Sequence, residues 1–216
     1  MIALIFDMDG VLIDSNVMHR KSWTEFNRRY GVETTGEMHR RMYGKRNDEI
    51  VRDFFGTGLS DDEAEARGRA KEALYREMVG TGVEEMLVPG VREFLERHGN
   101  LPMALGSNAE PENIEFLLDG AGLRQYFGAV VDGLQVASAK PHPDIYLRAA
   151  GLLGVPPEDC IVFEDSHSGV EAGVAAGMRV IGIRTTFVNL PGTTLTVDNF
   201  LSGELESWLQ AQLRAA

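Results

Sequence analysis

Short apolar runs alternate with helix-like stretches along most of this 216-residue chain, and this alternation limits the folds it can adopt. Runs rich in aliphatic and β-branched residues end in a turn or an acidic residue at 2–6, 102–105, 129–131, 160–163 and 179–183. Between them the pattern predicts helices near 90–98, 110–120, 143–153 and 168–177. Strands and helices of these lengths in alternation indicate an α/β fold, a doubly wound and mostly parallel sheet with helices on both faces.

Residues 16–83 interrupt this alternation. Here the sequence predicts helices near 16–30, 46–55 and 61–79, the last opening with the acidic run Asp61-Asp62-Glu63 that favours a helix N-terminus. We therefore expect a discontinuous α/β core domain, residues 1–15 and 84–216, and an inserted helical domain, residues 16–83. The chain would cross between them near residues 14 and 84, and residues 202–216 would close the core as an amphipathic helix.

Composition excludes several classes of protein. Hydrophobic residues make up 44% and charged residues 25%, as in soluble globular proteins, and no apolar run approaches the ~20 residues that cross a bilayer. With 33 acids against 21 bases the net charge is −12, which argues against nucleic-acid binding. The single cysteine, Cys160, suits a reducing cytoplasm, where we expect the protein to reside. The sequence does not determine the oligomeric state, and a monomer is compatible with it.

Polar residues follow four of the predicted strands. These are Asp7-Met8-Asp9-Gly10-Val11, Gly106-Ser107-Asn108, Lys140-Pro141 and Phe163-Glu164-Asp165-Ser166. In parallel sheets ligands bind at the carboxyl ends of strands, so we expect these groups to meet. Asp7 and Asp9 lie two apart, and in an extended segment their side chains point the same way. Four acids crowded together require a cation, and hard oxygen ligands without histidine or cysteine indicate Mg²⁺, although Mn²⁺ fits the same ligands.

This set of groups suits phosphoryl transfer, which needs a nucleophile, a metal, a fixed cation and a proton donor. Lys140 and the hydroxyl of Ser107 would hold phosphate oxygens that the metal leaves free. A carboxylate nucleophile would form an aspartyl-phosphate. Asp9 is placed to protonate the leaving alcohol and then to deprotonate the incoming acceptor.

The stretch Asp7-Met8-Asp9-Gly10-Val11-Leu12-Ile13-Asp14 resembles the first signature of the haloacid dehalogenase (HAD) superfamily. Ser107, Lys140 and Glu164-Asp165 match its second, third and fourth signatures in order and spacing. The segments 140–146 and 164–170 resemble the branch that contains β-phosphoglucomutase and many small sugar-phosphate phosphatases. The resemblance covers nearly the whole chain, and four ordered motifs together are far more specific than any one of them.

The resemblance implies a role for each matching position. Asp7 would be the nucleophile and a metal ligand, and Asp9 the general acid/base, with its backbone carbonyl also at the metal. Glu164 and Asp165 would complete the Mg²⁺ site. Ser107, Asn108 and Lys140 would bind the transferring phosphoryl group. The helical insertion would correspond to the family's cap, which closes over the substrate and excludes water.

The acceptor of the phosphoryl group separates two hypotheses. His19 and Lys71 match cap positions of β-phosphoglucomutase, which favours a mutase, and with Arg46 they are the candidate cap contacts to substrate. However, the mutase grips a second phosphate with a Gly-x-Ser-Arg segment, and here Gly44-Lys45-Arg46-Asn47 moves the arginine one place nearer the glycine. Ser107-Asn108-Ala109 also departs from the mutase's Ser-Ala-Ser. We therefore expect a phosphatase acting on a small sugar or polyol phosphate, with a β-phosphoglucomutase-like mutase as the alternative.

The sequence disfavours two further classes of protein. A dehalogenase-type hydrolase would use Asp7 on a carbon centre, but that chemistry needs neither Mg²⁺ nor the acid at Asp9. A non-catalytic binding module is disfavoured because no signature is missing. The identity of the small phosphorylated metabolite depends on cap surfaces that the sequence does not position, and so does the resting position of the cap.

Overall fold

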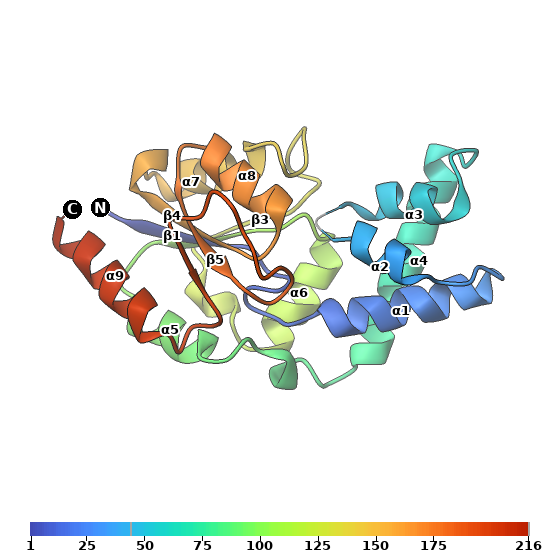
Figure 1. Cartoon of the computed structure of the whole chain (residues 1–216), viewed down its shortest axis with the longest axis horizontal. Coiled ribbons are helices and arrows are strands. Elements are labelled where there is room, and N and C mark those ends of the chain that lie inside the picture. Colours follow the sequence, from blue (N-terminus) through green and yellow to red (C-terminus); the bar gives the residue numbers. More distant parts are fainter. Residues whose placement is uncertain (44, 216) are drawn as a thin grey trace.

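Six parallel strands form one sheet within residues 1–43 and 45–215, the part of the chain that the computed structural model describes (Figure 1). The order across the sheet is β3-β2-β1-β4-β5-β6. In chain order the strands are β1 (Ala3–Phe6), β2 (Met103–Gly106), β3 (Ala129–Val131), β4 (Cys160–Glu164), β5 (Arg179–Ile183) and β6 (Leu195–Val197). The fold is therefore the Rossmann-like α/β architecture that the sequence predicts.

Helices cover both faces of this sheet (Figure 1). One face carries α7 (Asp144–Leu153) and α8 (His167–Ala175), and the other α5 (Val91–Arg97), α6 (Pro111–Gly120) and α9 (Gly203–Ala215). Strand β1 feeds both layers, because successive side chains alternate between the faces: Ala3 and Ile5 join the core under α7 and α8, whereas Leu4 and Phe6 join the other. Short 3₁₀ helices, Glu84–Met86, Arg124–Tyr126 and Pro157–Asp159, complete the connections.

The chain reverses direction across the sheet between β1 and β4. After β1 it adds β2 and β3 on one side, and it then returns to place β4 on the other side of β1. Phe6 is in register with Phe163, their rings stack at 4.6 Å, and the amide of Asp7 donates to the carbonyl of Phe163 at 3.0 Å. This switch point is where open α/β sheets bind ligands.

The helical insertion lies beyond the carboxyl ends of the strands (Figure 1). It contains α1 (Asn16–Arg29), α2 (Gly36–Arg41), α3 (Asn47–Phe55) and α4 (Asp61–Val79). These helices bury an apolar cluster of their own around Trp23, Phe26 and Phe54. A reciprocal capping box between Ser60 and Glu63 starts α4, and the acids that follow favour the positive end of its dipole.

The two crossings between core and insertion run side by side. The amide of Asp14 donates to the carbonyl of Met86 at 2.7 Å, and that of Val88 donates to the carbonyl of Leu12 at 3.0 Å. The predicted strands and longer helices are found, and their ends agree with the prediction to within two residues. The sequence pattern did not predict α2 and β6, whose few residues depend on the surfaces they pack or pair against. No helix in residues 1–43 and 45–215 has the length and apolar character to span a membrane.

Candidate active site

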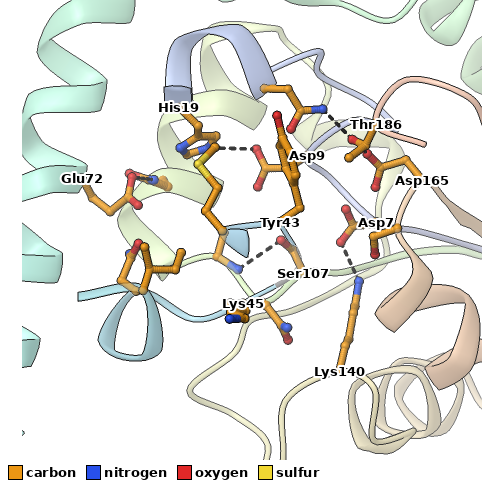
Figure 2. Close-up of a pocket in the computed structure, with 18 of the residues that line it drawn as sticks. Asp7, Asp9, His19, Tyr43, Lys45, Glu72, Ser107, Lys140, Asp165 and Thr186 are labelled. Carbon is orange, nitrogen blue, oxygen red and sulfur yellow. Dashed lines mark hydrogen bonds and ion pairs between the residues drawn. The ribbon is translucent and has the colours of Figure 1, made fainter. Parts of the chain in front are cut away.

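Three buried carboxylates meet at the carboxyl ends of β1 and β4. Asp7 follows β1, Glu164 ends β4 and Asp165 comes next, and each offers an oxygen within 4.8 Å of the others. Figure 2 shows Asp7 and Asp165 next to each other in the pocket. Lys140 is also buried, and its Nζ donates to Asp7 Oδ1 at 2.6 Å and to Glu164 Oε1 at 2.7 Å. One ammonium group thus donates hydrogen bonds to two of the three carboxylates.

Glu164 is the most tightly held of these carboxylates. Besides Lys140, its Oε1 accepts the hydroxyl of Tyr146 at 2.7 Å. Its Oε2 accepts the amides of Asp165 and Ser166 at 2.9 and 3.0 Å, and the Ser166 hydroxyl at 3.0 Å. Burial acts to raise the pKa of Glu164, but the charge of Lys140 and these donors outweigh it and hold the pKa below its ordinary value.

The other two carboxylates have raised pKa values. The pKa of Asp7 rises to about 7, mainly because the carboxyl is buried. Lys140 lowers this pKa, but the negative charges of Glu164 and Asp9 raise it further. Burial and the charge of Glu164 raise the pKa of Asp165 well above its ordinary value. Three buried carboxylates thus share one lysine, and their ionised forms are destabilised by burial and by mutual repulsion. A divalent cation with oxygen ligands fits this donor set, and Asp7 and Asp165 are the carboxylates with the fewest protein donors to hold it.

Two glycines make room for these acids. Gly10 has φ +79°, and a Cβ there would overlap Oδ2 of Asp165. Gly169 lies in the first turn of α8, and a Cβ there would overlap both carboxylate oxygens of Glu164. Glycine in both motifs thus has a steric reason, since any side chain would displace a cluster carboxylate.

Asp9 lies in the same pocket but turns away from the acid cluster (Figure 2). Its Oδ1 accepts the hydroxyl of Ser15 at 2.5 Å and lies 3.4 Å from Nε2 of His19. Burial acts to raise the pKa of Asp9, but His19 and Ser15 outweigh it and lower the pKa. The expectation of four crowded acids without a nearby histidine is therefore wrong. The chain does not stay extended after Asp7: the carbonyl of Met8 accepts the amides of residues 11, 12 and 13, and this turn separates the two aspartates.

The predicted phosphate-binding residues line this pocket from the core side. Ser107, Asn108 and Lys140 all border it. Ser107 is fixed by its amide, which donates to the carbonyl of Val131 at 3.0 Å, and by its hydroxyl, which accepts the amide of Ala109 at 3.2 Å. The structure thus brings these groups together with Asp7 and Asp9.

The candidate cap residues divide into two groups. His19 and Lys71 line the pocket, and Lys71 Nζ lies 2.8 Å from Nδ1 of His19 and 2.7 Å from Oε1 of Glu72. Arg46 does not line it, because its Nη2 donates to the carbonyl of Gly133 at 2.5 Å. Lys45 and Asn47 line the pocket instead. Arg46 has extended backbone angles, so its side chain points opposite to those of its neighbours. The arginine stands one position earlier than in the mutase segment, and this difference of one position directs it out of the pocket. Gly44, which opens this segment, lies outside the described residues.

Sequence reasoning missed further residues of the site. Thr186 connects the core to the first helix of the insertion. Its hydroxyl donates a hydrogen bond to Oδ2 of Asp165 and accepts one from Nδ2 of Asn16 at 2.6 Å. Thr185 donates to the carbonyl of Gly10 at 2.5 Å. These threonines follow the fifth predicted strand after one intervening residue, Arg184, so the rule that located the other groups would also have found them. The buried Tyr146 gave no such signal, since its hydroxyl reaches Glu164 only through the packing of α7.

The comparisons with known proteins agree with this geometry. Residues 1–177 match the family described as haloacid dehalogenase-like hydrolase. The chain belongs to that family. The fructose-1-phosphate phosphatase YqaB of Escherichia coli K12 is 37% identical over 183 residues, covering 84% of this chain and 96% of that protein. A β-phosphoglucomutase of Bacillus subtilis 168 is 30% identical over 186 residues, covering 84% and 82%.

The crystal structure of a β-phosphoglucomutase from Clostridium difficile superimposes with a TM-score of 0.87 at 25% identity, covering 100% of this chain and 98% of that one. This haloacid dehalogenase-like hydrolase is therefore an enzyme of the β-phosphoglucomutase-like branch, whose members include phosphatases and phosphomutases.

Proposed function

We propose that this enzyme is a Mg²⁺-dependent phosphatase that hydrolyses a small sugar or polyol phosphate through an aspartyl-phosphate on Asp7. The observation that carries the proposal is one pocket shared by Asp7, Asp9, Lys140 and Ser107, which the cap residues His19 and Lys71 face from the other side. The relatives named for fructose 1-phosphate and β-phosphoglucose chemistry support a phosphorylated carbohydrate as substrate.

Each group of the chain has a task in this reaction. Asp7 attacks the phosphorus, and the bond between phosphorus and the alcohol oxygen breaks. Lys140 and Ser107 hold phosphoryl oxygens in place during transfer. A bound Mg²⁺, held by Asp7, Asp165 and the carbonyl of Asp9 with Glu164 behind them, would neutralise charge on the phosphoryl oxygens and on Asp7.

Asp9 handles the protons in both steps. Its lowered pKa keeps it ionised at neutral pH, the form that accepts a proton from the water attacking the aspartyl-phosphate. To protonate the leaving alcohol it must first take up a proton, and the negative phosphoryl group beside it favours that uptake. Ser15 and His19 orient its carboxylate.

The same proposal covers the division of the chain. Residues 1–15 and 84–216 act as the catalytic core, and residues 16–83 act as a cap that closes over the substrate and excludes bulk water. Paired backbone hydrogen bonds at Asp14 and Val88 make the two crossings a natural hinge.

A mutase of the β-phosphoglucomutase type is the second candidate, favoured by the positions of His19 and Lys71. The phosphatase is preferred because a mutase must hold a second phosphate in the cap, and Arg46 is engaged by the carbonyl of Gly133. In the phosphatase, the phosphoryl group on Asp7 is transferred to water and not to a second sugar hydroxyl.

The test is a Mg²⁺-dependent screen of phosphate release from sugar and polyol phosphates, with Asp7→Asn as the matched inactive protein. We expect release from one or a few compounds, abolished by a chelator and by the substitution. Conversion of β-glucose 1-phosphate to glucose 6-phosphate faster than phosphate release would overturn the phosphatase in favour of the mutase.

A further inference from the structure

The pocket that holds Asp7 also reaches a buried ion pair of the cap. Lys71 and Glu72 of α4 line this pocket together with Asn113 of α6. Each of these three side chains is at most 3% exposed. Figure 2 shows Glu72 on the opposite side of the pocket from Asp7. We call Lys71, Glu72 and Asn113 the distal cluster.

Glu72 is fixed from both the cap and the core. Its Oε1 accepts Lys71 Nζ at 2.7 Å, and its Oε2 accepts Asn113 Nδ2 at 2.5 Å. Asn113 is held in turn, because its Oδ1 accepts Nη1 of Arg76 at 2.5 Å. The carboxylate of Glu72 therefore has one defined position at the pocket before any substrate binds, which is the condition for precise recognition.

The distal cluster carries two charges that balance each other. Burial acts to raise the pKa of Glu72, but Lys71, His19 and Asn113 outweigh it and lower the pKa to about 2. Glu72 is therefore ionised at neutral pH, and the ammonium of Lys71 offsets its charge. Such a pair offers no net charge to a phosphate, and what it presents to a ligand is its hydrogen-bonding capacity.

The pair still has both an acceptor and a donor to give. Within residues 1–43 and 45–215 each oxygen of Glu72 accepts one hydrogen bond, and a carboxylate oxygen can accept two. Within the same residues Lys71 Nζ contacts two acceptors, His19 and Glu72, and an ammonium has three N–H donors. A hydroxyl both donates and accepts, so hydroxyls match this pair. Phosphate oxygens that only accept, and alkyl groups that do neither, match it less well.

The distal cluster is connected to the group that protonates the leaving alcohol. Asp9 Oδ1 lies 3.4 Å from Nε2 of His19, and Nδ1 of the same ring lies 2.8 Å from Lys71 Nζ. A leaving group whose ester oxygen meets Asp9 would therefore reach Glu72 by extending along two side chains. The part of the substrate that contacts the distal cluster is the alcohol, and the transferring phosphoryl group stays with Asp7.

Stability alone does not explain a buried ion pair at this position. Removing two charges from water costs several kcal/mol per ion, and apolar side chains of similar size often stabilise a protein as well or better. Other cap residues that line the same pocket, Trp23, Met42 and Ile50, are apolar. An apolar leaving group would suit those side chains, but it would cover the ion pair without offering it a hydrogen bond.

We propose that Glu72, positioned by Asn113, is a specificity-determining residue that accepts a hydrogen bond from a hydroxyl of the leaving alcohol and so selects phosphate esters of polyhydroxylated alcohols. The inference rests on the proposed phosphatase activity and assigns its substrate selection to one residue. A site built around a buried polar group rejects an analogue that leaves this group without a partner.

The test compares kcat/KM for Mg²⁺-dependent phosphate release from sorbitol 6-phosphate and from hexyl phosphate, which have the same chain of six carbons. We expect the wild type to prefer the sorbitol ester by about 100-fold or more. The hydroxyls also make sorbitol a better leaving group, but this advantage is the same for every variant. The change in the ratio of the two kcat/KM values therefore reports on Glu72.

Three substitutions in and near the distal cluster should change this ratio to different extents. Glu72→Gln removes the charged acceptor and should lower the ratio about tenfold, the scale of one hydrogen bond to a charged group. Glu72→Asp keeps the charge on a shorter side chain and should lower it less. Asn113→Ala releases the carboxylate and should also lower the ratio. Glu77→Gln, an exposed acid of the same helix, is the matched control and should leave the ratio unchanged.

The outcomes separate this inference from the proposed function. A wild type that hydrolyses the two esters equally, or a ratio that neither Glu72→Gln nor Asn113→Ala lowers, overturns the role of Glu72 and leaves the phosphatase standing. A fall that Glu77→Gln reproduces also overturns it, because overall charge would then be the cause. If Glu72→Gln does not fold, the wild-type ratio and Asn113→Ala decide. If no compound of the screen releases phosphate, the proposed function fails and the inference with it.

Discussion

Replacing Gly169 with alanine should displace the carboxylate of Glu164 and damage both stability and catalysis. The new Cβ would occupy the space of that carboxylate, which cannot move freely because it accepts five hydrogen bonds of 2.7–3.0 Å. A hydrogen bond to a charged group contributes ~1.5–3 kcal/mol, so losing two costs ~3–6 kcal/mol. The better helix propensity of alanine returns ~1 kcal/mol, which leaves a net loss of about 2–5 kcal/mol.

Gly151→Ala is the matched control for this substitution. Gly151 lies inside α7, and a Cβ there would meet nothing within 4 Å. It should therefore raise the free energy of unfolding by ~0.5–1 kcal/mol and leave activity unchanged. Thermal unfolding followed by circular dichroism should show a Tm lower by roughly 5–15 °C for Gly169→Ala and higher by about 2 °C for Gly151→Ala. Phosphate release with Mg²⁺ should fall sharply only for the first. Equal Tm values and equal activities for the two variants would refute the steric argument.

Three other perturbations have defined outcomes. Because the pKa of Glu72 falls from 4.5 to about 2 on folding, its contribution to stability is complete above pH 4.5 and is lost as the pH falls towards 2. Glu72→Gln should therefore lower unfolding free energy by up to about 3 kcal/mol at pH 7 and much less near pH 2, as measured by urea unfolding across pH. Lys45→Met should raise KM about tenfold with a smaller effect on kcat, since an exposed cation at the pocket attracts substrate more than it stabilises the transition state. Thr186→Val removes a donor to Asp165, and it should raise the Mg²⁺ concentration for half-maximal activity by ~10-fold or more.

Each of these perturbations has a control in the chain. Glu77→Gln changes an exposed acid of the same helix as Glu72 and should not alter the pH profile of stability. Lys21→Met removes an exposed cation of α1 away from the pocket, and an equal rise in KM would show that overall charge, not Lys45, attracts the substrate. Thr194→Val changes an exposed threonine beyond β5, and a Mg²⁺ requirement that moves equally in both threonine variants would contradict the role of Thr186.

Much of the core was predictable because its signals are local. The strands after which Asp7, Ser107 and Asp165 stand are short apolar runs, and a parallel sheet gathers their carboxyl ends at one edge. The order and spacing of the acidic and basic motifs indicate phosphoryl transfer from the sequence alone. Glycine is required in two of those motifs at the same edge of the sheet, because a side chain at Gly10 or Gly169 would overlap a carboxylate.

The sequence by itself therefore determined the α/β architecture and the residue types at the carboxyl edge, because periodicity and motif spacing act over a few residues. Only the tertiary structure decided where individual side chains point. Asp9 turns to His19, Arg46 leaves the pocket to Lys45 and Asn47, and Thr186 joins Asp165 to α1. The orientation of Asp9 depends on the turn that follows β1, and that of Arg46 on its position in an extended segment. The contacts of Thr186 join segments that lie more than a hundred residues apart in the sequence. Such contacts are fixed by packing in three dimensions, and no local sequence pattern records them.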